Sequence, residues 1–259
     1  MNAADVVIVH WGPPEPTLAT AGVAQATGWP VTVVDNAGTF PLRESASVRV
    51  LRPGANIGFG RGVNRGAAVG GAPWILLLNP DTSAEPDDLT RLVAIAEGHS
   101  DVGVLAPTLV NFDGSPQIGG GRFTGWPREL ARVSGAGRRV RALRARIRRE
   151  FRGERFGALI DRSWVSGAAM LVRRVVFEAV GGFDERFFLY YEDEDLCRRI
   201  RDRGWRVATT PEVRVKHAVG ESSPASFEAS RALYHRLHSG PVLQRVVRWD
   251  AARRTRALG

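Results

Sequence analysis

Residues 74–97 read WILLLNPDTSAEPDDLTRLVAIAE, in which a fully apolar run, a polar turn and an amphipathic segment follow one another. The apolar run, Trp74–Leu78, is short and continuous, as in a strand that is buried on both faces of a sheet. The segment Pro86–Glu97 has helical periodicity, with an apolar face made by Leu89, Leu92, Val93 and Ala96. A buried strand followed at once by an amphipathic helix is typical of α/β proteins.

The same alternation extends in both directions from this stretch. Further strands are predicted at Val6–His10, Val31–Val34, Val48–Leu51, Val102–Leu105, Trp164–Val172 and Val213–His217. Helices are predicted after Pro16 up to about Thr27, and at Arg61–Val69, Arg174–Val180, Asp193–Arg203 and in the tail from Phe227. The sequence therefore predicts an α/β fold with a mostly parallel central sheet and helices on both of its faces.

The composition of the 259-residue chain, 44% hydrophobic and 24% charged, is that of an ordinary globular protein. No apolar run approaches the ~18–20 residues that span a bilayer, and the N-terminal residues lack the features of a signal peptide. The single cysteine, Cys197, excludes an internal disulfide and a cysteine-based zinc site. We therefore expect a cytoplasmic protein of one or two domains.

The formal net charge of +9 is concentrated in one segment. Between Arg128 and Arg155 there are eleven arginines and three glutamates, which leaves only +1 for the rest of the chain. An apolar stripe recurs in this segment at helical spacing, formed by Val140, Leu143, Ile147 and Phe151. The pattern predicts a basic amphipathic helix, which either binds an anionic membrane surface or packs its stripe on the rest of the protein. The arginines also raise the alternative of a nucleic-acid-binding protein, but no nucleic-acid-binding motif accompanies them.

Polar residues follow three of the predicted strands at their carboxyl ends. Asp35 and Asn36 follow the second strand, Asn79-Pro80-Asp81 follows the fourth, and His217 ends the last. Ligands of open α/β sheets bind beyond these ends, so the three groups are candidates for one site. Because Asp and Asn also begin turns, each group taken alone is equally well explained by the turn that it starts.

A glycine-dense segment, Asn56–Gly66, opens one of the predicted helices. Glycines let a backbone approach a phosphate, and a helix N-terminus favours an anion. No Gly-Lys-Ser/Thr follows, so the segment is not a P-loop. The spacing Gly60-x-Gly62-x-x-x-Gly66 has one residue too many for a dinucleotide fingerprint, which argues against a nicotinamide-dependent enzyme.

The strongest local signal is the stretch GGFDERFFLYYEDEDL at residues 181–196. Four successive acidic residues, Glu192–Asp195, follow an aromatic run. Packed carboxylates repel one another, which raises the pKa of at least one of them and suits it to act as a general base. The alternative is an acidic helix start, in which the carboxylates complement the helix dipole.

In this order, the motifs resemble those of the family 2 glycosyltransferases, and most closely their bacterial rhamnosyltransferase-like branch. The resemblance covers about residues 5–225. The stretches that carry it are VVDN at 33–36, NIGFGRGVN at 56–64, LLLNPD at 76–81, WVSGAAMLVRR at 164–174, GFDERFFLYYEDEDL at 182–196 and His217. It implies a GT-A fold, the fold of nucleotide-diphospho-sugar transferases, and an inverting transfer of a sugar from a nucleotide sugar.

The resemblance also implies a role for each matching residue. Asp35 would pair with the base, the backbone near His10 and Trp11 would lie along it, and the Asn56–Asn64 loop would face the ribose and diphosphate. The full donor site comprises His10, Trp11, Asp35, Asn36, Asn56, Gly58, Phe59, Gly60, Asn64, Asn79 and Asp81.

The resemblance places a divalent cation and a general base as well. Asn79-Pro80-Asp81 stands where the family has a metal-binding Asp-x-Asp motif, with an amide in place of the first acid. A divalent cation, Mg²⁺ or Mn²⁺, is expected at Asp81 and His217. Asp193 matches the general base of the family, with Glu192 and Asp195 as supporting acids.

The rhamnosyltransferase-like branch implies a donor, an acceptor and a location. The donor would be dTDP-L-rhamnose, and the acceptor a glycan or polyprenyl-diphosphate-linked sugar in cell-envelope polysaccharide synthesis; a UDP-sugar donor and a soluble acceptor remain alternatives. We expect a catalytic domain at residues 1–225, with the basic segment at about 128–155 as an insert, and a helical basic tail at 226–259. We expect a peripheral position on the inner face of the cell membrane and no binding of nucleic acid.

Overall fold

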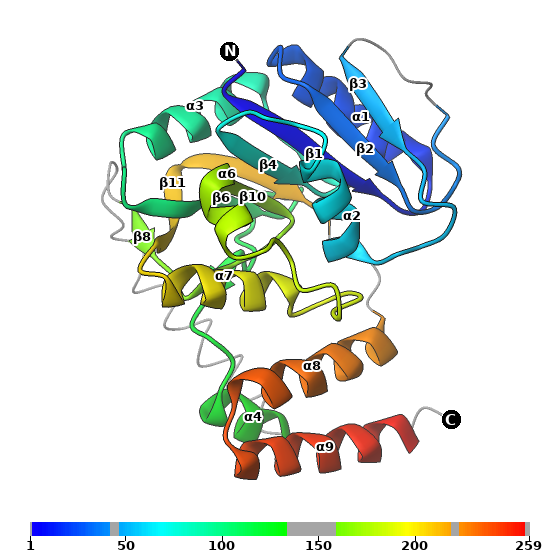
Figure 1. The fold of residues 1–259 in the computed structure, drawn as a ribbon, viewed down its shortest axis with the longest axis vertical. Helices are drawn as coiled ribbons and strands as arrows, with labels where there is room; N and C mark the ends of the chain where they lie inside the picture. The colour runs from blue at the N-terminus through cyan, green and yellow to red at the C-terminus, as the bar shows by residue number, and fades with distance from the viewer. Residues whose placement is uncertain (1, 42–46, 134–158, 219–222, 257–259) are drawn as a thin grey trace.

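The computed structural model describes residues 2–41, 47–133, 159–218 and 223–256, and its centre is a nine-stranded sheet (Figure 1). The strands lie in the order β3-β2-β1-β4-β10-β6-β11-β5, and β8 also pairs with β11. Their bounds are β1 Ala4–His10, β2 Val31–Asp35, β3 Val48–Leu51, β4 Trp74–Leu78, β5 Thr82–Ser83, β6 Val102–Val110, β8 Ile160–Asp161, β10 Ala169–Arg173 and β11 Arg206–His217. Strands β3, β2, β1, β4, β6 and β11 run in one direction, and β10, β8 and β5 run against them.

Helices cover both faces of this largely parallel sheet, as predicted. One face carries α1 (Pro14–Ala26) and α3 (Pro86–Glu97), and the other carries α2 (Phe59–Ala67), α6 (Arg174–Ala179) and α7 (Glu192–Asp202). The side chains of β1 alternate between the two cores. Val6 and Ile8 are buried with α1 and α3, whereas Val7 and Val9 are buried with α2, α6 and α7.

A layer of helices lies beyond α7, at the lower end of the molecule in Figure 1. It consists of α4 (Trp126–Val133), α8 (Pro224–His238) and α9 (Pro241–Arg256). A buried aromatic cluster of Phe187, Tyr191 and Tyr234 joins α8 to the segment that precedes α7. The tail is therefore helical as predicted, and it forms two helices in succession.

The prediction of one continuous strand at Trp164–Val172 is wrong. Residues Trp164–Val165 form β9, which pairs with β7 (Gly120–Gly121) in a separate two-stranded sheet. The chain then turns, since the amide of Ser166 donates to the carbonyl of Gly119 at 2.9 Å, and β10 enters the central sheet antiparallel between β4 and β6. The turn falls at Ser166 and Gly167, which interrupt the apolar residues of this stretch.

Two further predictions concern the rest of the chain. The last strand is longer than predicted, because β11 begins at Arg206 and pairs with β6 up to Lys216, with an interruption between Thr210 and Arg214. Of the segment Arg128–Arg155, predicted to form a basic amphipathic helix, residues 128–133 belong to α4, and the rest, with its apolar stripe, lies outside the described residues. Within the described ranges, no helix is long and apolar enough to cross a membrane.

Candidate active site

A cavity of about 280 Å³ opens where β4 and β11 end. Its walls come from the residues after β4, the turn before β10, the start of α7 and the helices α4 and α8. Three groups that the sequence singled out line it, namely Asn79, His217 and the acidic run with Asp193. The parallel strands thus bring separate motifs to one edge of the sheet, as expected for this class of fold.

The start of α7 directs the acidic run into this cavity. Tyr190 and Tyr191 both have left-handed backbone conformations, with φ of 73° and 66°, which non-glycine residues rarely adopt. Asp193 follows, partly exposed, and its two carboxylate oxygens accept hydrogen bonds from the amides of Glu194 at 2.8 Å and Gly167 at 3.2 Å. Burial outweighs these two hydrogen bonds and raises the pKa of Asp193 to about 6. This carboxylate is therefore ionised at neutral pH and still basic enough to accept a proton.

The neighbouring Glu192 is more deeply buried, with 5% of its surface exposed. Burial, and then the charge of Asp193, raise its pKa to about 8. Its Oε2 atom has no hydrogen-bond partner within the described part of the chain. Burial therefore favours the neutral form more strongly at Glu192 than at Asp193.

The other two acids of the run are engaged inside the protein. Glu194 accepts two hydrogen bonds from Thr124, one from its amide and one from its hydroxyl at 2.8 Å. Asp195 bonds to Arg199 at 2.8 Å and to His238 of α8 at 2.7 Å, and only 1% of it is exposed. Asp195 therefore links α7 to α8, and neither of its oxygens is available to an acceptor hydroxyl.

The predicted cation ligands lie together. The pairing of β5 with β11 places His217 beside Thr82, so that the His217 Nε2 atom lies 3.3 Å from an Asp81 oxygen and 3.3 Å from the Asn79 Nδ2 atom. The described residues contain no group of three His, Cys, Asp or Glu side chains that could hold a metal. Asp81 and His217 would supply two ligands, and substrate phosphates and water the rest, a mixed set that suits Mg²⁺ or Mn²⁺.

Gln117 positions this histidine, and the sequence did not reveal it. Its Oε1 atom lies 2.8 Å from Nδ1 of His217, and its Nε2 donates to Asn111 Oδ1 at 3.0 Å and to the His217 carbonyl at 3.3 Å. These bonds assign the proton to Nδ1 and leave the Nε2 lone pair facing Asp81, the arrangement of a metal-ligating histidine. Gln117 lies in a turn-rich stretch without periodicity, so no sequence signal marked it.

The predicted base contact of Asp35 is not available in this conformation. One Asp35 oxygen accepts from the amides of Gly38 at 2.7 Å and Thr39 at 3.2 Å, and the other accepts from Phe40 at 3.1 Å. Its side chain is fully buried. Asp35 therefore holds the turn after β2, and pairing with a base would require this turn to move.

His10 is enclosed by the protein, whereas Trp11 is exposed to solvent. Both ring nitrogens of the buried His10 have partners, the hydroxyls of Thr17 at 2.7 Å and Thr39 at 3.1 Å. Burial is the larger influence on its pKa and lowers it, despite the charge of Asp35. Trp11 is 61% exposed, so this end of β1 offers a ligand its backbone and an indole surface.

The loop before α2 joins the ends of β2 and α7. The Nδ2 atom of Asn36 donates to the Gly58 carbonyl at 3.1 Å and to Asn56 Oδ1 at 3.3 Å, and its own buried Oδ1 has no partner in the described ranges. Gly58 has φ of 88°, and a Cβ there would lie 2.5 Å from the carbonyl of Phe188. Phe59 lines the cavity, and its amide donates to the same carbonyl at 2.9 Å.

The remaining glycines of this segment serve packing. A Cβ would lie 2.9 Å from Phe183 if it were added to Gly60, and 2.5 Å from Val7 if it were added to Gly66, so both let α2 approach its neighbours closely. Asn64 accepts from the Phe183 amide at 2.9 Å and donates to the Phe183 carbonyl at 2.9 Å. Gly60 and Asn64 thus hold the segment before α7, and the position of their loop facing the ribose and diphosphate stays a prediction.

A largely parallel sheet with Asp81, His217 and the partly exposed Asp193 near its carboxyl edge is the architecture of an α/β enzyme site. Comparisons with known proteins agree. Residues 31–237 match the family described as "Glycosyltransferase like family 2". The N-acetylglucosaminyl-diphospho-decaprenol L-rhamnosyltransferase of Mycobacterium tuberculosis H37Rv is 31% identical over 265 residues, which cover 89% of this chain and 81% of the relative. The chain therefore belongs to the family 2 glycosyltransferases and is homologous to L-rhamnosyltransferases.

Solved structures agree on the fold. Staphylococcus aureus TarS 1-349 in complex with UDP-GlcNAc matches with a TM-score of 0.59 and 14% identity, over 92% of this chain and 67% of that one. GalNAc-T7 with UDP, GalNAc and Mn²⁺ matches with a TM-score of 0.58 and 15% identity, over 86% of this chain. This chain spans 45% of GalNAc-T7. These likenesses confirm the predicted GT-A fold.

Proposed function

We propose that this enzyme transfers L-rhamnose from dTDP-L-rhamnose to a hydroxyl of a polyprenyl-diphosphate-linked sugar, with inversion, in cell-envelope polysaccharide synthesis. The activity for which the mycobacterial relative is named supports the sugar and the acceptor class. The sequence motifs quoted above support the nucleotide. The proposal includes a catalytic domain at residues 1–225, and contact of the basic segment with the inner face of the membrane.

The observation that carries this proposal is the environment of Asp193. It lies in the cavity, has a pKa of about 6 and is held by two backbone amides. In this proposal Asp193 accepts the proton of the acceptor hydroxyl while that oxygen bonds to the anomeric carbon, and the bond to the diphosphate breaks on the opposite face. Positioned general bases contribute roughly 10²–10⁴-fold to a rate.

The predicted cation ligands, Asp81 and His217, support the departure of the nucleoside diphosphate. Asp81 and His217 would hold a divalent cation, which when bound would neutralise the negative charge of the departing nucleoside diphosphate. Gln117 keeps the histidine in the tautomer that this role requires. The buried Asn36 Oδ1, which has no hydrogen-bond partner among the described residues, offers the donor a further acceptor.

The test is a panel of nucleotide sugars with the purified protein. We expect dTDP-L-rhamnose to raise the melting temperature and to be hydrolysed slowly when Mg²⁺ or Mn²⁺ is present, and both effects to disappear in excess chelator. UDP-glucose, UDP-N-acetylglucosamine and GDP-mannose are the competing donors. A larger effect of a UDP-sugar would replace the donor, and full activity in chelator would overturn the cation site.

A further inference from the structure

The cavity next to Asp193 has one cationic wall. Among the described residues that line it, Arg128 of α4 is the only arginine or lysine. Asn79 lies 3.3 Å from His217, whereas Arg128 bonds to Thr124, and among the described residues no hydrogen bond or ion pair joins these two sets. A negative group bound at Arg128 would thus meet Thr124 rather than the predicted cation ligands.

The Arg128 guanidinium has capacity for such a group. Its side chain is exposed and donates one hydrogen bond, from Nη1 to the Thr124 hydroxyl at 3.3 Å. Within the ranges that the structure describes, it forms no ion pair with a carboxylate. Thr124, which accepts the hydrogen bond from Arg128, also bonds to the carboxylate of Glu194. Both Glu194 oxygens already accept hydrogen bonds from Thr124. The other N–H groups of Arg128 therefore donate to no group in the described part of the chain.

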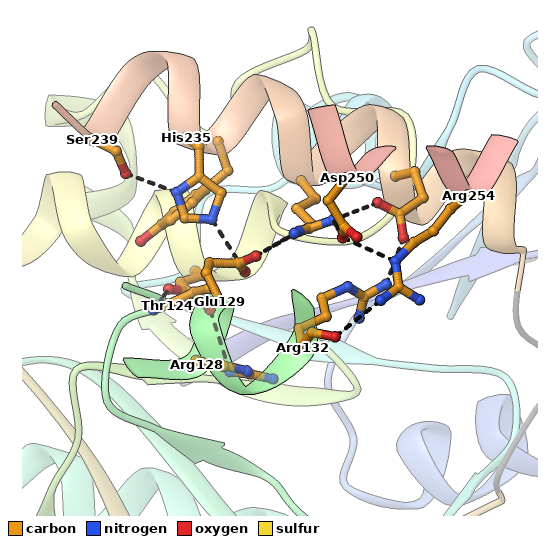
Figure 2. Close-up of polar contacts among 12 residues, drawn as sticks. Thr124, Arg128, Glu129, Arg132, His235, Ser239, Asp250 and Arg254 are labelled. Carbon is orange, nitrogen blue, oxygen red and sulfur yellow. Dashed lines mark hydrogen bonds and ion pairs between the residues drawn. The ribbon is translucent and has the colours of Figure 1, made fainter. Parts of the chain in front are cut away.

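The helix that carries Arg128 is fixed by a buried ionic cluster (Figure 2). Glu129, 1% exposed, bonds to Arg231 of α8 and lies 3.3 Å from His235. Arg132 pairs with Glu228 of α8 at 2.5 Å. Figure 2 shows Glu129 directed toward His235, while Arg128 lies on the other side of α4. These contacts attach α4 to α8 and leave the Arg128 guanidinium, which lines the cavity, outside the ionic cluster.

We propose that Arg128 binds a phosphate group of the acceptor and so selects acceptors that carry a diphosphate next to the sugar. This inference rests on the proposed function and names the residue that reads the acceptor class. The planar guanidinium presents paired N–H donors that match phosphate oxygens. The aromatic side chains of Trp164, Tyr190 and Phe227 line the same cavity and offer faces on which the acceptor sugar can rest.

The test compares two acceptors that share one sugar, a short polyprenyl-diphosphate-linked N-acetylglucosamine and an alkyl N-acetylglucosaminide. Arg128→Ala should raise the KM of the diphosphate acceptor by about 10- to 100-fold, the range expected when charge-assisted hydrogen bonds are lost. The KM of the alkyl glycoside and the rate of donor hydrolysis should not change. Arg128→Lys should recover part of the loss. Arg122→Ala, which removes an exposed arginine outside the cavity lining, is the matched control.

Binding measurements separate this inference from the proposed function. Farnesyl diphosphate serves as a soluble prenyl diphosphate, titrated calorimetrically with the donor end filled by saturating dTDP. If Arg128→Ala weakens this binding and Arg122→Ala does not, the phosphate site stands, whichever sugar is transferred. Equal losses with both acceptors, or an unchanged affinity for farnesyl diphosphate, would overturn it.

Discussion

Replacing the buried Arg231 by methionine should cost a large part of the stability of this protein. The Arg231 side chain is completely buried and pairs with Glu129, with Glu228 at 2.8 Å and with Asp250 at 2.9 Å. Glu228 keeps Arg132 as a partner and Asp250 keeps Arg253 and Arg254, whereas Glu129 is left with the His235 ring 3.3 Å away, so the main damage falls on Glu129. Removing one partner of a buried ion pair costs about 3–5 kcal/mol, against total stabilities of about 5–15 kcal/mol.

The free energy of unfolding that Arg231→Met loses should depend on pH, and the contacts of Glu129 determine whether the loss grows or shrinks as the pH falls. Burial alone would raise the pKa of Glu129, but hydrogen bonds from His235 and Arg231 and the Arg231 charge lower it below its ordinary value of 4.5. An acid whose pKa is lowered on folding stabilises the fold above its unfolded pKa, and this contribution disappears as the pH falls. The deficit of Arg231→Met should therefore be largest near pH 7 and shrink toward pH 4.

Urea unfolding followed by circular dichroism at pH 7, 5.5 and 4 measures this deficit. Arg236→Met is the matched control, because Arg236 is an exposed arginine on the same helix. We expect its free energy of unfolding to stay within about 0.5 kcal/mol of the wild type. A deficit of Arg231→Met below about 1 kcal/mol, or one that stays constant with pH, would refute the ionic account of this layer.

Three other outcomes follow from the site and the fold. Because Asp193 must be ionised and its pKa is about 6, kcat/KM should fall about tenfold per pH unit below that value and level off above it; a profile flat down to pH 5 would contradict this. Gln117→Leu should weaken Mn²⁺ affinity about 10- to 100-fold, measured as the metal dependence of donor hydrolysis, since it frees the His217 ring. Gly66→Ala should lower stability by about 1–3 kcal/mol in urea unfolding because its Cβ would meet Val7, whereas Gly22→Ala, with open space around it, should not.

The parts of the site that the sequence could predict are those fixed by strand ends. Asn79-Pro80-Asp81 follows an apolar strand and His217 ends another strand, and parallel strands bring such ends to one edge, so the pattern predicts that they lie near each other. The acidic run was likewise visible as a sequence of like charges. The different roles of the four acids were not visible in the sequence. Burial decides which carboxyl group more readily keeps its proton, and long-range bonds to Thr124 and His238 decide which carboxylates already have partners.

The parts that could not be predicted share a physical reason, namely contacts between residues far apart in sequence. Gln117 meets His217 across 100 residues and carries no local signal. Gly60 and Gly66 look the same in sequence whether they admit a phosphate or a valine side chain, and the structure shows packing. Asp35 has the position of a base-binding residue, yet the turn that it starts takes up both of its oxygens.

The central claim is that Asp193, and not its neighbour, is the general base, and one paired measurement tests it. Donor affinity and transfer rate are compared for the wild type, Asp193→Asn and Glu192→Gln, with thermal unfolding to show that each variant is folded. The account predicts that Asp193→Asn binds the donor as the wild type does but loses about 10²–10⁴-fold in transfer. Glu192→Gln resembles the neutral side chain that burial already imposes and should stay within about tenfold of the wild type. Near wild-type transfer by Asp193→Asn, or loss in Glu192→Gln alone, would contradict it.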